Sequence, residues 1–134
     1  MDTPEYQAMV YRQSLMRVIA FKAGRVRGMA DGNIPVDEAE FLRSANELAT
    51  LAGMIEDGAV SGSDSESVPG SNALPAIWDD LAAFGERAAN LRAAAETVAS
   101  QAQAGGFAAA QAAASGDIGP NCGGCHRNFR QSDD

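Results

Sequence analysis

Residues 122–126 read Cys-Gly-Gly-Cys-His and contain both cysteines and the single histidine of the chain. A Cys-x-x-Cys-His run is the signature by which a c-type haem is attached. Two thiols on neighbouring helical turns add to the two vinyl groups along one porphyrin edge, and the histidine then faces the iron. We therefore predict one covalently bound haem c, anchored by Cys122 and Cys125, with His126 as the axial iron ligand.

Three other interpretations of this motif agree less well with the sequence. A structural zinc site needs four ligands, and the chain has only 2 Cys and 1 His. A thioredoxin-like dithiol would follow a strand of a βαβ unit, and the sequence has no strand pattern. A disulfide between Cys122 and Cys125 would leave the adjacent His126 unexplained. The haem interpretation is favoured, and a redox dithiol is its main alternative.

Composition and charge exclude several classes of function. The 134 residues fit a single domain over 1–134, and 27 alanines with only 6% aromatics favour closely packed helices over a sheet. With 10 basic and 18 acidic residues the net charge is -8, which disfavours nucleic acid and anionic membrane surfaces as partners. No apolar stretch approaches the length of a membrane span, about 18 residues or more.

The compartment is inferred from the motif, because the N-terminus gives no targeting signal. Residues 1–5 read Met-Asp-Thr-Pro-Glu, whereas a signal peptide begins with basic residues and continues through an apolar run. Haem is attached covalently on the outer side of the energy-transducing membrane. We therefore expect a periplasmic bacterial protein, in a mature form from which the leader is absent.

Apolar periodicity predicts four helices over residues 4–30, 37–57, 75–104 and 107–131. The segment 58–74 is rich in Ser, Gly, Asp and Pro and lacks periodicity, so it is predicted as a long loop within the domain. Four helices of comparable length with one long loop describe an antiparallel bundle, in which cofactors bind between facing helices.

Local signals mark several helix ends. Thr3 is suited to cap the first helix, and Asp37 with Glu40 three residues later resembles a capping box. A kink or short break is expected before Cys122 because helix-breaking residues precede it. These are Gly116, Gly119 and Pro120.

The chain resembles the cytochrome c′ family of bacterial haem proteins. The resemblance rests on the runs Tyr11-Arg12-Gln13-Ser14-Leu15-Met16, Ala73-Leu74-Pro75-Ala76-Ile77-Trp78-Asp79 and Cys122-x-x-Cys125-His126-x-x-Phe129-Arg130. It implies an all-α fold, an antiparallel up-down-up-down four-helix bundle that encloses a covalently attached haem.

The resemblance also implies contacts around the haem. Arg12 lies within an apolar helix face, where an unpartnered guanidinium is costly, and the haem propionates would be its partners. Its alternative is to extend its charged end to the end of the bundle. Gln13 and Asn72 are carried over as further haem-edge contacts. Phe129 is expected against the haem or core, and Arg130 near the proximal face unless it is simply solvated.

Met16 decides between two functions. The family places this position over the iron, opposite the histidine. If the thioether stays off the iron, the haem is five-coordinate and high-spin, and its apolar face suits nitric oxide and carbon monoxide better than dioxygen. If the sulfur coordinates, the protein is a low-spin, six-coordinate electron carrier. The high-spin interpretation is favoured, with possible electron transfer to a redox partner that the sequence does not identify.

Other expectations concern the core, assembly and chemistry. Trp78 and Phe84 are expected in the core and as walls of the haem pocket, and Met54 in the core. No set of residues suggests an acid–base or nucleophilic site, so we expect no enzymatic activity. The first helix has a broad apolar face, and the resemblance implies a homodimer through helices 1 and 2.

Overall fold

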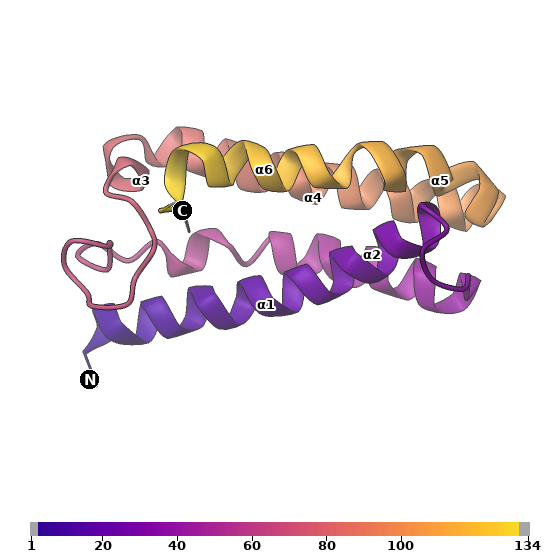
Figure 1. The fold of residues 1–134 in the computed structure, drawn as a ribbon. Coiled ribbons are helices and arrows are strands. Elements are labelled where there is room, and N and C mark those ends of the chain that lie inside the picture. The colour runs from indigo at the N-terminus through magenta and orange to yellow at the C-terminus, as the bar shows by residue number, and fades with distance from the viewer. Residues whose placement is uncertain (1–2, 132–134) are drawn as a thin grey trace.

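The computed structural model describes residues 3–131, which form an antiparallel helical bundle (Figure 1). Its elements are α1 (Pro4–Ala30), α2 (Glu38–Ala52), the 3-10 turn η1 (Glu56–Gly58), α3 (Ala76–Asp79), α4 (Leu81–Gly105), α5 (Phe107–Gly116) and α6 (Ile118–Phe129). The chain runs along α1, returns along α2, runs forward again along α4 and returns along α5 and α6. The predicted all-α, antiparallel four-helix bundle is confirmed.

The first two helices begin where their capping residues lie. The Thr3 side chain accepts a hydrogen bond from the backbone N–H of Tyr6 (3.1 Å), and Asp37 accepts one from Glu40 (3.0 Å). The capping box is only half formed, because the Glu40 carboxylate binds Arg25 at 2.6 and 2.7 Å. That hydrogen bond is the main reason why the pKa of Glu40 is lowered.

The second helix ends earlier than predicted, at Ala52 and not at residue 57. Beyond Gly53 the backbone changes to shorter-range bonds, from Met54 N–H to Leu51 (3.0 Å) and from Ile55 N–H to Ala52 (3.3 Å). The predicted core position of Met54 is also wrong, since this side chain is 37% exposed.

The predicted helix over 75–104 is divided at Asp80. The backbone of Asp80 is not helical (φ -149°, ψ 72°), and its carboxylate accepts a hydrogen bond from the N–H of Ala83 (3.0 Å). Asp80 therefore ends α3 and caps α4, because an aspartate offers the backbone a better partner at a helix start than inside a helix.

The interruption expected before Cys122 falls at Asp117, where α5 ends and α6 begins. Pro120 lies in the first turn of α6, where a missing backbone N–H leaves no helical bond unmade. The motif 122–126 is thereby carried on a helix of its own.

Small residues let the helices pack closely around a core that is only partly filled by large side chains. Phe41, Leu48, Ala45, Ala95 and Val98 are completely buried. No helix of residues 3–131 is both long enough and apolar enough to cross a membrane.

Candidate functional site

A cavity of about 650 Å³ is lined by side chains of α1, α3, α4 and α6 and by residues of the segment between α2 and α3. This volume lies within the range of small-molecule and cofactor sites, about 300–1,000 Å³. The nine residues that the sequence assigned as anchors, iron ligand or contacts of the haem all line this cavity. They are Arg12, Gln13, Met16, Asn72, Cys122, Cys125, His126, Phe129 and Arg130.

Helix α6 presents the motif to the cavity from one face. Residues 122, 125 and 126 are three and four positions apart, so their side chains lie on adjacent turns. Both thiols are free and half-buried, and burial raises the pKa of Cys122 and of Cys125. Burial, followed by the nearby Arg130, lowers the pKa of His126. The imidazole is thus held neutral, the form that binds metals.

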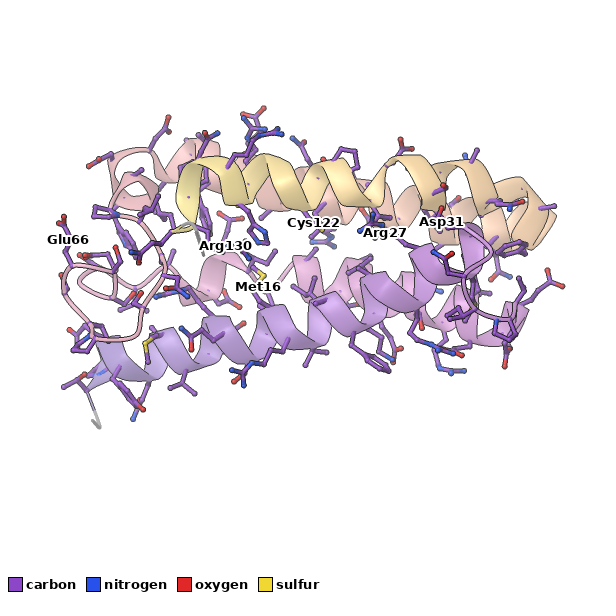
Figure 2. All side chains as sticks on the ribbon, in the orientation of Figure 1. Met16, Arg27, Asp31, Glu66, Cys122 and Arg130 are labelled. Atoms are coloured by element: carbon purple, nitrogen blue, oxygen red, sulfur yellow. The ribbon has the colours of Figure 1, made fainter. Side chains whose placement is uncertain are left out.

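Helix α1 supplies the wall across from the motif. Met16 is half-buried, and Figure 2 shows its sulfur directed into the space between α1 and α6. Leu15 and Ile19 continue this wall with apolar surface, and Phe84 lines the cavity from α4. A flat apolar group bound in this cavity would therefore contact carbon and sulfur atoms of α1 on one face. Its other face would contact the imidazole nitrogen of His126 on α6.

The structure gives Arg12 partners that the sequence did not suggest. Its Nη1 donates to the Gly58 carbonyl (2.7 Å) and the Ser63 hydroxyl (2.6 Å). Its Nη2 donates to the Ser63 carbonyl (2.6 Å) and the Ser71 hydroxyl (3.1 Å). Burial lowers the pKa of Arg12, and the nearby Asp64 opposes this shift. Only the Nε–H of this guanidinium takes no part in these four hydrogen bonds. The main structural role of Arg12 is therefore to hold the loop in place.

The same loop is fastened to the end of α6. Gln13 donates to the Gly70 carbonyl (2.9 Å), and the Asn72 carbonyl accepts from the Gln131 N–H (2.7 Å). The Leu74 N–H donates to the Phe129 carbonyl (3.0 Å). The loop therefore joins α1 to the segment that follows His126, and it closes one end of the cavity.

One expected wall residue lies elsewhere. Trp78 packs against the core, and its ring lies 5.9 Å from the Arg12 guanidinium carbon, but it does not line the cavity. The preceding residue of α3, Ile77, lines the cavity in its place, and Phe84 lines it from α4.

Three arginines that the sequence did not indicate also line the cavity, Arg17, Arg27 and Arg87. Two of them lie against glycines of α6. A Cβ atom at Gly119 would be 3.1 Å from Arg27 Nη2, and one at Gly124 would be 3.1 Å from Arg87 Nη1. No pattern in the sequence indicates these approaches, because the partners are far apart in the chain.

The sequence profile of the family described as Cytochrome C' matches residues 7–130. The chain belongs to the cytochrome c′ family. It is 35% identical to cytochrome c' from Halomonas halodenitrificans, over 92% of this chain and 95% of the relative. It is 33% identical to cytochrome c-554 from Cereibacter sphaeroides, over 98% of this chain and 99% of the relative.

The fold is also that of solved cytochrome c′ structures. A nitric oxide complex of a mutant cytochrome c prime from Alcaligenes xylosoxidans superimposes with a TM-score of 0.81 at 28% identity, and covers 96% of this chain and 97% of that one. Cytochromes c′ are c-type haem proteins, so the cofactor implied for this cavity is haem.

The residues present fit that cofactor. Two unpaired thiols and one neutral imidazole face a largely apolar cavity, which is the donor set that a covalently held haem needs. Within residues 3–131, no three His, Cys, Asp or Glu side chains are grouped to hold a metal ion by themselves. A haem needs only one such ligand, because the porphyrin supplies the other four.

Proposed function

We propose that this chain is a periplasmic c-type haem protein that binds nitric oxide and carbon monoxide at a five-coordinate, high-spin iron. It can also exchange electrons with a partner protein. The cofactor supplies an iron that binds diatomic ligands and changes its oxidation state. The observation that carries the proposal is that Met16 and His126 line the same cavity from different helices, α1 and α6.

Cys122 and Cys125 hold the cofactor through thioether bonds, and His126 is the axial ligand to iron. Arg12, through its remaining N–H, and Gln13 and Asn72 meet the propionate edge. Phe129 packs against the haem face and also contacts Phe84 edge-on at 5.6 Å between ring centroids. Arg130 lies on the same side of the haem as His126.

The surroundings of Met16 support selection among gases. Its neighbours Arg12 and Gln13 donate hydrogen bonds to the loop, at Gly58, Ser63 and Gly70. These two side chains are therefore engaged by the loop, and Leu15 and Ile19 offer apolar surface beside Met16. Dioxygen depends on a donor because its adduct carries negative charge, whereas nitric oxide and carbon monoxide depend on one much less. A nitric oxide complex of a mutant relative from Alcaligenes xylosoxidans supports nitric oxide as a ligand.

A second candidate function follows from the thioether of Met16. If its sulfur bound the iron, the protein would be a low-spin electron carrier with methionine and histidine as axial ligands. Met16 is half-buried, and its sulfur points into the space between α1 and α6. Both features favour this alternative.

One set of spectra tests both candidates. Protein produced in a host that attaches haem to c-type cytochromes is expected to be red and to keep its haem in acid acetone. The ferric form is expected to show a high-spin spectrum. The far-red charge-transfer band of methionine-bound iron would establish the low-spin alternative, and a colourless product would exclude both.

A further inference from the structure

The cavity has an unusual charge for this molecule. It is lined by five arginines and by none of the carboxylates in residues 3–131. The chain has only 10 basic residues against 18 acidic ones, so half of its basic side chains gather at one site. These arginines are Arg12, Arg17, Arg27, Arg87 and Arg130.

Arg27 and Arg87 lie at the edge of the cavity beside α6. Both side chains are exposed, and in the described part of the chain neither forms an ion pair with a carboxylate. Arg12, by contrast, is half-buried and bonded to the loop. Arg17, further along α1, adds a third exposed cation to the rim of the same cavity.

Arg27 and Arg87 lie beside the cysteines. They come from α1 and α4, and they approach α6 at Gly119 and Gly124, where the absence of a side chain leaves room for a guanidinium. Figure 2 shows Arg27 reaching from α1 toward α6, close to Cys122. We call Arg27 and Arg87 the thioether-edge pair.

A bound haem would leave this pair unneutralised. Thioether bonds to Cys122 and Cys125 would hold the vinyl edge of the porphyrin, which is opposite the edge that carries the two propionates. The propionates would therefore lie away from Arg27 and Arg87, and the positive charge would stay next to the half-exposed cysteines.

We propose that the thioether-edge pair is a docking surface for the acidic face of an electron-transfer protein. A local cluster of charge orients an approaching partner even when the net charge has the other sign. One electron then passes from ferrous protein to the oxidised partner, giving ferric protein and reduced partner, with no bond or proton transferred. The inference rests on the proposed function, because it requires a haem at this edge.

A redox-inert anion locates the surface without any electron transfer. Hexacyanochromate(III), a paramagnetic trianion, is added to haem-loaded, ¹⁵N-labelled protein in its diamagnetic ferrous carbon monoxide form, and amide line broadening is mapped. The expected result is broadening concentrated at residues 119–125 and around Arg27 and Arg87. Broadening that is centred elsewhere, or spread evenly, would overturn the inference.

The salt dependence of electron transfer gives a second, independent measurement. With ferricyanide as oxidant, repulsion by the net charge of -8 would make the rate rise as salt is added. Attraction at the thioether-edge pair predicts the opposite, namely that the rate falls at least about threefold between low and physiological salt. A wild-type rate that rises with salt would indicate a docking site of the other charge and overturn the inference.

Charge-matched variants separate local from net charge. In the Arg27→Gln/Arg87→Gln variant, the rate of electron transfer is expected no longer to fall as salt is added. In the Arg27→Lys/Arg87→Lys variant, the rate is expected to fall as in the wild type. The control Arg43→Gln/Arg92→Gln removes the same net charge from exposed positions outside the cavity, and should behave like wild type. Equal effects in both Gln pairs would contradict the proposal. A colourless wild-type protein would instead mean that the proposed function has failed.

Discussion

Single side chains set the chemistry of this cavity, because their burial and hydrogen bonds decide which groups remain free to bind a ligand. His126 is kept neutral by burial, so its imidazole can bind iron. Arg12 and Gln13 donate hydrogen bonds to loop carbonyls, so neither is directed only at the space beside Met16. The residue that controls access to the iron is therefore a flexible thioether, which can move aside without breaking a hydrogen bond.

The Met16→Ala substitution tests this role. Removing the thioether is expected to increase the association rate of carbon monoxide by about tenfold or more, equivalent to a barrier lower by about 1.4 kcal/mol. Flash photolysis of the ferrous complex measures it. Met54→Ala is the matched control, because Met54 is exposed and outside the cavity. Unchanged kinetics in Met16→Ala would remove Met16 from the ligand pocket.

Among the elements, the loop of residues 59–75 has the largest effect on the site. The composition of the loop does not suggest this effect. Its backbone bonds to Arg12 and Gln13 on α1, and to Phe129 and Gln131 beyond the motif. The Ser-rich composition that predicts an irregular segment also supplies the buried hydroxyls of Ser63 and Ser71. The loop thus fixes the distance between the ends of α1 and α6.

Arg12→Ala is expected to destabilise the fold by about 2–4 kcal/mol. The variant loses hydrogen bonds from a charged donor and leaves the buried Gly58 carbonyl without this partner, whereas the Ser63 carbonyl keeps its bond from the Ser71 hydroxyl. Urea unfolding measures the loss, and faster proteolysis within residues 59–75 locates it. Arg17→Ala, one turn along α1 and exposed, should cost less than about 0.5 kcal/mol. Similar losses in the two variants would show that the loop does not depend on Arg12.

At the scale of the whole molecule, α1 has apolar surface that the bundle does not cover. Val10, Val18 and Phe21 are 42%, 46% and 63% exposed. They are spaced along one side of the helix, at intervals of eight and three residues. A second copy that packs on this side would bury them, in agreement with the proposed homodimer through the first two helices.

The double substitution Val18→Glu/Phe21→Glu is expected to give a monomer where the wild type sediments as a dimer at micromolar concentration. Charged side chains at the interface would be desolvated without partners. Leu81→Glu, at an exposed apolar position on α4 that is 49% accessible, should leave the dimer intact. A wild type that sediments as a monomer, or the same assembly in both variants, would be evidence against this interface.

The sequence alone determined the fold class and the motif that carries the chemistry. Helical periodicity and capping are local, so they are readable from neighbouring residues, and Cys-x-x-Cys-His needs only five consecutive positions. The division of the third helix at Asp80 was missed, because an aspartate inside an apolar repeat can be either exposed or capping.

Only the tertiary structure decided what surrounds the motif. The bonds from Arg12 to Ser63 and Ser71 join residues more than 50 positions apart, and Arg27 and Arg87 reach α6 from two other helices. Such pairings depend on how the helices rotate about their axes and where the loop crosses them. No local pattern encodes that rotation, because it is set by the packing of all the helices at once.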